Sequence, residues 1–271
     1  MAEEKINLKE HPILADRKEY VENEIIEFVK GSVIRKVFNT RAFDPSKDAK
    51  TEFIKLGTSS ITNKEWYVKM PGNTYYDWKP IPKMYADSIE EGEIKLVLEK
   101  ILPAIKGQDK FSEIVEDKNP AAANVFGKLL DQAITKVLNA DLIITNIHDD
   151  HKFFWLDKQR FKFDYQRKER YLSGTYDGIN IFVSRIVPKG KTIILNAKEV
   201  GDFIVKKDIS ANLGEIRDDE RAKLKEILNL SDDDLNNRVR LLIEEVIQFV
   251  IKKPEAAILI ETSKEEEESK V

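Results

Sequence analysis

The chain has 271 residues, enough for one large domain or two intertwined subdomains, and 41% of them are hydrophobic, as in an ordinary soluble globular protein. It contains no cysteine, which excludes disulfides, cysteine nucleophiles, thiolate metal sites and iron–sulfur clusters. A net charge of −4 gives no general case for binding nucleic acid. Charged residues reach 35%, against about 25% in an average protein, which favours a thermophilic source.

Signals for secretion or membrane insertion are absent from the sequence. No apolar run approaches the roughly 18 residues of a membrane span. The first residues, Met1–His11, lack the apolar core of a signal peptide. The sequence therefore predicts a cytoplasmic protein.

The N-terminal part predicts a helix from Leu14 to Val37, with Asp16 able to cap its start. Gly31 breaks this helix, and a β-type segment is expected from Val33 to Phe38. The apolar residues at three-and-four spacing are Tyr20, Val21, Ile25, Phe28 and Val29.

Residues 51–88 are unusually aromatic. Two strand-like pieces, Lys64 to Met70 and Thr74 to Trp78, flank Pro71-Gly72-Asn73, which is a strong turn signal. Two interpretations stay open: a hairpin packed on its own core, which is the commoner case, or an arm that packs on another subunit, where Tyr and Trp are enriched. The aromatic residues concerned are Trp66, Tyr67, Tyr75, Tyr76, Trp78 and Tyr85.

The middle of the chain predicts two amphipathic helices and a buried strand. The first helix places Ile94, Val97, Leu98, Ile101 and Ile105 on one face, with a kink expected at Pro103. The second helix runs from Val125 to Leu138, and the strand Leu142 to Thr145 follows it. A short helix is expected at Phe153-Phe154-Trp155.

The second half predicts strands followed by one charged helix, residues 216–229. The strands are Ile179 to Ser184, Thr192 to Ala197 and Gly201 to Lys206. Asp232-Asp233-Asp234 is expected to be a polar hinge into the longest strand, Val239 to Ile251, whose odd positions are apolar and which ends at Lys252-Lys253-Pro254. A short apolar run, Ala256 to Ile260, precedes an acidic tail around Glu265 to Glu268.

One histidine pair suggests metal chemistry. His148 and His151 are three residues apart and could share a metal ion with a carboxylate, as in a metal-dependent hydrolase. The commoner interpretation is a helix start, because Asp149 and Asp150 would lie near a helix N-terminus. The third histidine, His11, is remote.

Other catalytic patterns are missing. The chain has neither a G-x-G-x-x-G loop nor a Walker-type lysine loop, and Ser173-Gly174 lacks the strand-to-helix elbow of a nucleophilic serine. The basic and aromatic stretch 158–170 is diluted by acids and is typical of a solvated edge. The sequence therefore predicts no enzyme, no catalytic residue and no metal site.

Several motifs together resemble a known family. Tyr176 to Ser184, Val187-Pro188-Lys189-Gly190-Lys191 and Gly201-Asp202-Phe203 resemble the A-domain of tailed-bacteriophage capsid proteins of the Hong Kong ninety-seven type. The end of the chain, Val239 through Pro254-Glu255-Ala256, resembles the closing P-domain strand of the encapsulins, which are nanocompartment shells with the same fold. Lys18 to Phe38 resembles the encapsulin N-terminal helix, with its Arg-Lys-(Val)-Phe ending.

This resemblance implies an α+β, phage-capsid-like fold with an N-terminal helix, an extended E-loop, a P-domain with a spine helix and long strands, and an A-domain. The implied boundaries are 1–50 for the N-terminal helix and start of the P-domain, 51–88 for the E-loop, 89–122 for the spine helix and its connection, 123–235 for the A-domain, 236–261 for the closing strands and 262–271 for a disordered acidic tail.

The resemblance also implies a self-assembling icosahedral shell. As an encapsulin, the shell would enclose a cargo protein held by a cargo targeting peptide, with Tyr20 and Phe28 as candidates for the lumenal binding surface. For each of these two residues, simple packing of the helix on the P-domain is an equal alternative. E-loop contacts between subunits would be made by Trp66, Tyr75, Tyr76 and Trp78.

A viral or proviral capsid protein enclosing DNA is the alternative within the family. We expect the encapsulin, because the shell fold starts almost at Met1, with no scaffold-like leader before it. Some encapsulins bind flavin beside an E-loop tryptophan, but the corresponding position here is Met84, so no cofactor is expected.

Overall fold

The computed structural model describes residues 12–32, 34–63, 80–105, 111–112, 120–149, 151–154, 156, 160–163 and 172–262. These residues belong to two compact units, each assembled from three stretches of the chain. The first unit draws on Met1–Val33, Phe43–Gly92 and Val205–Ile247, and the second on Ile34–Ala42, Glu93–Ile204 and Gln248–Val271. Three elements contribute to both units: α4 (Pro80–Ile105), β9 (Gly201–Gly214) and β10 (Arg238–Ile251).

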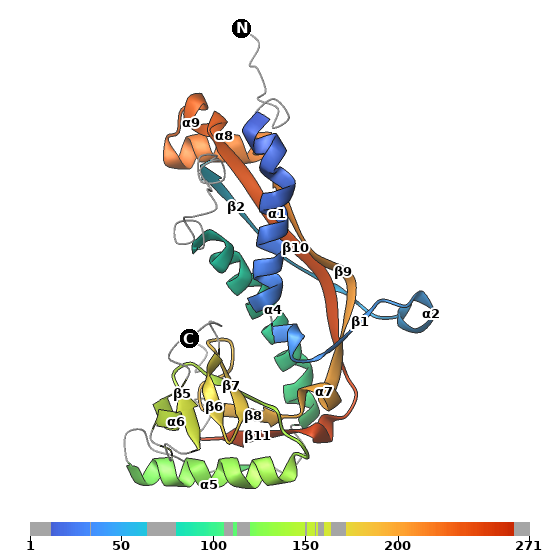
Figure 1. The fold of residues 1–271 in the computed structure, drawn as a ribbon, viewed down its shortest axis with the longest axis vertical. Helices are drawn as coiled ribbons and strands as arrows, with labels where there is room; N and C mark the ends of the chain where they lie inside the picture. The colour runs from blue at the N-terminus through green and yellow to red at the C-terminus, as the bar shows by residue number, and fades with distance from the viewer. Residues whose placement is uncertain are drawn as a thin grey trace, which may run out of the picture. The chain divides into compact units, whose positions relative to one another are not determined.

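The core of the first unit lies between helix α1 (Pro12–Ser32) and the strands β9 and β10, which run alongside it (Figure 1). Val21, Ile25 and Val29 follow helical spacing and are buried together, so one face of α1 packs on the strands. The unit also contains α2 (Pro45–Asp48), β2 (Ile54–Asn63), α8 (Asp218–Leu228) and α9 (Asp232–Asn236).

Strand β10 has the alternation that its sequence predicts. Val239, Leu241 and Ile243 are buried in the core of the first unit, while the residues between them are half-buried. β10 belongs to a four-stranded sheet with the order β1-β9-β10-β2, in which β1 is Asn39–Ala42. β2 and β10 pair antiparallel without interruption, from Arg238↔Asn63 to Ile247↔Ile54. The long final strand is therefore confirmed.

The second unit is built on a seven-stranded sheet with the order β3-β11-β8-β4-β7-β6-β5. β4 pairs parallel with β7 and antiparallel with β8, and all five β4 residues are buried. The elements are η2 (Ile34–Lys36), β3 (Phe111–Ser112), α5 (Pro120–Lys136), β4 (Leu142–Asn146), α6 (His151–Phe154), β5 (Phe161–Phe163), β6 (Leu172–Tyr176), β7 (Ile179–Ser184), β8 (Lys191–Leu195), α7 (Ala197–Val200), η3 (Pro254–Ala256) and β11 (Ala257–Glu261).

Helix α5 covers one face of this sheet (Figure 1). Its buried side chains, Phe126, Leu130 and Ala133, pack with residues of β4, β7, β8 and β11 such as Ile143 and Ile260. The tight β6–β7 turn has positive φ at both central residues, 50° at Asp177 and 83° at Gly178, as the Asp-Gly pair of a type I′ hairpin requires.

Two local expectations were wrong. The β-type segment Val33 to Phe38 contains the 3-10 turn η2, and the strand β1 begins only at Asn39. The backbone N–H of Arg35 donates to the Glu93 carboxylate, a bond to a distant helix that local propensity does not reveal. The segment at Asp232, expected to be a polar hinge, is helix α9. Ser231 caps this helix, and the negative charges of three acidic residues in its first turn interact favourably with the helix dipole.

Other elements differ in length from the sequence prediction. β9 continues to Gly214 rather than ending at Lys206, because its polar side chains pair across the sheet, Lys207 with Glu244 for example. The spine helix α4 begins at Pro80, whereas the spine helix was expected within residues 89–122. The strand pieces expected between Lys64 and Trp78 lie outside the described residues, as does the acidic tail.

Candidate assembly surfaces

The described residues hold no group of three or more His, Asp or Glu side chains placed to bind a metal ion. His148 lies exposed in the turn after β4, whereas Asp149 is buried. The Asp149 carboxylate accepts hydrogen bonds from the Lys152 ammonium at 2.8 Å and from the Gly190 backbone N–H at 2.6 Å. The side chain of His151 lies outside the described part of the chain. Asp149 is therefore paired with Lys152, and the other neighbouring carboxylate, Asp150, lies outside the described residues.

Lys152 also fastens the end of strand β11. Its ammonium donates to the Thr262 hydroxyl at 2.7 Å, and the Thr262 N–H donates to the Gly190 carbonyl at 2.8 Å. Asp149, Lys152 and Thr262 are 2%, 7% and 2% exposed, so this polar clamp is fully enclosed. Its hydrogen bonds hold together the β7–β8 turn, the β4–α6 turn and the end of β11.

Three of the motifs that carry the family resemblance meet in the second unit. Phe38, Phe203 and Phe249 form an aromatic cluster with ring centroids 5.1–5.6 Å apart. Gly201 makes this packing possible: a Cβ there would lie 2.6 Å from the Phe249 ring and 2.6 Å from the Val250 carbonyl oxygen. The Gly-Asp-Phe motif, the Arg-Lys-Val-Phe ending and the closing strand are therefore parts of one packing arrangement.

A buried ion pair lies in the same unit. The Arg35 guanidinium is 3.4 Å from the Glu93 carboxylate, and the Arg35 backbone N–H donates to it at 3.1 Å. Both side chains are nearly inaccessible, at 8% and 0% exposure. A buried pair of this kind positions η2 against α4, and removing one partner of a buried pair is strongly destabilising.

A second charged cluster surrounds Arg160, which donates to Asp131 at 2.6 and 3.0 Å and to Asp177 at 3.0 Å. The Tyr176 hydroxyl donates to Asp131 at 3.0 Å. These hydrogen bonds, that from Arg160 above all, hold the pKa of the Asp131 carboxyl below its usual range. Burial, then the Asp131 charge, raises the pKa of Tyr176, so this tyrosine stays neutral and serves as a donor.

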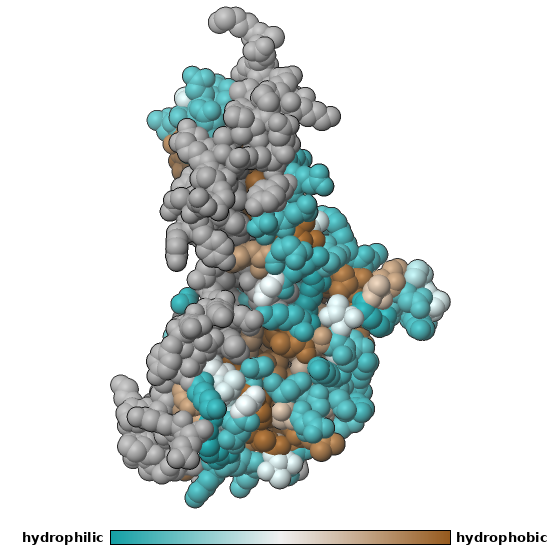
Figure 2. Space-filling view, in the orientation of Figure 1, coloured by the Kyte–Doolittle hydropathy of each residue, from teal (hydrophilic) through white to brown (hydrophobic). Residues whose placement is uncertain are grey.

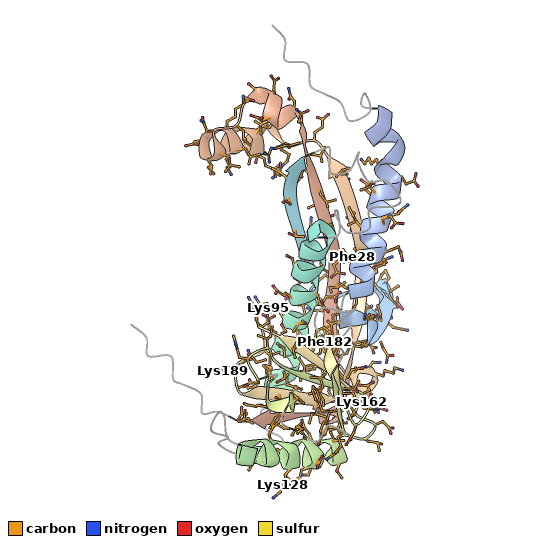
Figure 3. The ribbon with its side chains drawn as sticks, turned by 60° about the vertical axis from the view of Figure 1, so that its left-hand side comes forward. Phe28, Lys95, Lys128, Lys162, Phe182 and Lys189 are labelled. Carbon is orange, nitrogen blue, oxygen red and sulfur yellow. The ribbon has the colours of Figure 1, made fainter. Side chains whose placement is uncertain are left out.

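The exposed side of α1 is acidic. Glu19, Glu24 and Glu27 are exposed, whereas Glu22 accepts the Leu213 backbone N–H at 2.6 Å. Phe28, labelled on α1 in Figure 3, is half-buried against the core of the first unit. The side chain of Tyr20 lies outside the described part. The geometry therefore accounts for Phe28 by packing, and the cargo-binding role of both residues stays a prediction.

The four-stranded sheet offers two edges for contacts with other chains. All four residues of β1 are exposed. At the opposite edge, none of the described strands pairs with the second side of β2, whose ten residues contain no bulge and no proline. Unpaired backbone donors and acceptors on such an edge are a template for a strand of another chain.

The four aromatic residues assigned to E-loop contacts, Trp66, Tyr75, Tyr76 and Trp78, lie outside the described residues. None of the helices that the structure describes is long and apolar enough to cross a membrane. On the face shown in Figure 2 the described surface is mostly hydrophilic, with brown apolar side chains at a few places.

Comparison with solved structures identifies the fold. The chain superposes on the virus-like particle protein from Pyrococcus furiosus with a TM-score of 0.51 and 16% identity, covering 90% of this chain and 98% of that one. This chain has the capsid fold. The α+β encapsulin and phage-capsid architecture expected from the motifs is thereby confirmed, and at 16% identity the likeness concerns the fold alone.

Two further matches have TM-scores below 0.5. The holo-SrpI encapsulin complex from Synechococcus elongatus gives 0.48 at 10% identity, covering 84% of this chain and 86% of that one. The mature capsid of bacteriophage PhiM1 gives 0.43 at 11% identity, covering 78% and 71%. No protein-family profile and no curated protein matches the sequence.

Proposed function

We propose that this protein is a structural shell protein that self-assembles into an icosahedral nanocompartment of the encapsulin kind and encloses a cargo protein. The observation that carries the proposal is the capsid fold, matched over 98% of a virus-like particle protein. The sheet edges at β1 and β2 support it, since no further described strand pairs there and neighbouring copies of the chain can complete such edges.

Within the described residues, two buried carboxylates and one partly exposed carboxylate are each paired with a basic side chain. Asp149 is neutralised by Lys152, Glu93 by Arg35, and Asp131 by Arg160. A structural role without an enzymatic step agrees with this pattern.

Assembly is tested with the full chain by size-exclusion chromatography and negative-stain electron microscopy. We expect hollow particles of uniform diameter; a protein that stays a monomer or dimer at every concentration would refute the shell. In the same assay, Trp66→Ala together with Trp78→Ala should impair particle formation while circular dichroism shows a folded protomer. Unchanged particles would argue against E-loop contacts through these residues.

The contents of the particles distinguish the encapsulin from a viral capsid. An encapsulin purified from its native host should carry a protein cargo and no nuclease-resistant nucleic acid. Its neighbouring genes should include a cargo enzyme, for example a ferritin-like protein or a peroxidase. Packaged DNA, or neighbouring terminase and portal genes, would instead establish the capsid alternative.

The cargo surface is tested on α1. By resemblance, Tyr20 contacts the cargo targeting peptide, so Tyr20→Ala should reduce the cargo recovered per particle. Asn23→Ala is the matched control, because Asn23 is an exposed residue of the same helix. Equal cargo loading in Tyr20→Ala and wild-type particles would remove Tyr20 from the binding surface.

A further inference from the structure

Helix α8 exposes apolar side chains that the described part of the chain leaves uncovered. Ile227 is 75% and Leu228 is 54% exposed, and no residue of this helix is buried. Leu224 is half-buried one turn earlier, so these three residues form a continuous stripe, the α8 patch. Figure 2 shows apolar side chains at the edge of the otherwise hydrophilic α8–α9 region. Contiguous exposed apolar side chains, in contrast to single scattered ones, are a feature of contact surfaces.

The helix that carries the patch is firmly attached. The Arg221 guanidinium donates to the Asn236 side chain at 2.7 Å, and Lys225 pairs with Asp232, so α8 is held to α9. Glu220 lies 3.3 Å from the Arg240 guanidinium, which fixes the start of α8 to β10. An isolated helix of eleven residues is marginal in water, and these polar contacts are what keep α8 formed and its patch in place.

Two charged residues beside the patch complement each other. Lys223 and Glu226 are exposed, and within the described part of the chain neither forms an ion pair or hydrogen bond. Lys223 lies one turn before Ile227, and Glu226 directly precedes it. When two copies of α8 lie antiparallel about a two-fold axis midway between these residues, Lys223 of each copy faces the partner's Glu226. Each copy of α8 therefore carries both the basic and the acidic residue that two symmetric ion pairs need.

We infer that the α8 patch is a two-fold contact between two copies of this chain, in which the apolar stripes pack together and two Lys223–Glu226 ion pairs form at their rim. A two-fold contact uses the same surface twice and therefore has to be self-complementary. The inference rests on the proposed function, because it names a surface through which the copies of the shell protein meet.

Charge exchange in the full chain is the sharpest test. Lys223→Glu and Glu226→Lys, each made alone, place two like charges opposite each other and should weaken association by about tenfold. The double variant restores opposite charges and should recover wild-type association. The measurement is the concentration dependence of assembly in analytical ultracentrifugation, with thermal melting as the check that each protomer is folded.

The apolar stripe is tested separately. Ile227→Glu should weaken association more than tenfold without lowering the melting temperature of the protomer, because this side chain is already 75% exposed. Ala222→Glu is the matched control, since Ala222 is exposed on the opposite side of α8, and it should associate like the wild type.

The outcomes separate this inference from the proposed function. If wild-type particles form and the three test variants, Lys223→Glu, Glu226→Lys and Ile227→Glu, all assemble within twofold of the wild type, the α8 contact is refuted while the shell stands. Failure of the double variant to recover association refutes the reciprocal pair. If the wild type forms α8-dependent dimers but never particles, the contact holds and the proposed shell function falls.

Discussion

Replacing Gly201 by alanine should lower the free energy of unfolding by about 1–3 kcal/mol, the usual cost of overpacking a core. The added Cβ would lie 2.6 Å from Cζ of Phe249 and 2.6 Å from the backbone oxygen of Val250, where real Cβ atoms essentially never approach. The ring could rotate aside only by disturbing its contacts with Phe38 and Phe203. The oxygen belongs to β10 and moves only with the strand.

Backbone strain makes no contribution to this cost. Gly201 has φ of −179°, an extended conformation that any residue adopts, so the whole effect is steric. The matched control is Gly31→Ala in α1, where a Cβ meets nothing within 4 Å. Alanine is favoured over glycine in a helix by about 1 kcal/mol, so the same substitution should stabilise the protein there.

The assay is urea unfolding of unassembled protomers, followed by circular dichroism. Phe249→Leu in the Gly201→Ala background should recover only part of the loss, because the contact with the Val250 oxygen remains. If Gly201→Ala unfolds within 0.5 kcal/mol of the wild type, roughly the range of a neutral surface change, the close approach at this position is not what requires glycine.

Three further predictions concern the charged clusters. Glu93→Ala strips a buried arginine of its carboxylate and should cost about 3–5 kcal/mol in urea unfolding, and Glu93→Gln, which keeps an acceptor, should cost less; equal losses would contradict this. Thr262→Val removes a buried acceptor of the Lys152 ammonium and should cost about 1–3 kcal/mol, whereas a neutral result would mean that the clamp does not hold the end of β11. The pKa of Asp131 is lowered in the folded state, so its contribution to stability is present above the unfolded value of 3.8 and is lost as the pH falls through the folded pKa. The difference in unfolding free energy between the wild type and Asp131→Asn should therefore shrink between pH 7 and pH 3, and a difference independent of pH would refute the assignment.

Regular periodicity let the sequence predict the elements that carry most of the core. The odd apolar positions of Val239 to Ile251 predicted β10, and the helical spacing around Phe126 and Leu130 predicted α5. These patterns are readable because burial of one face repeats every two residues in a strand and every three to four in a helix. The motifs around Gly201 and Phe249 then indicated the capsid fold, although the sequence did not explain why the fold needs these particular residues.

Only the tertiary structure decided how those motifs act. Gly201 is required by a ring and a carbonyl about fifty residues away in the chain, and no local pattern reports such an approach. The 3-10 turn at Arg35 depends on Glu93, and the partners of Lys152 include a residue 110 positions later. The sequence by itself determined the strands and helices with a regular apolar period, such as β10 and α5, because that periodicity is local. The tertiary structure decided which buried charges and close contacts hold them together, because those depend on groups that meet only after folding.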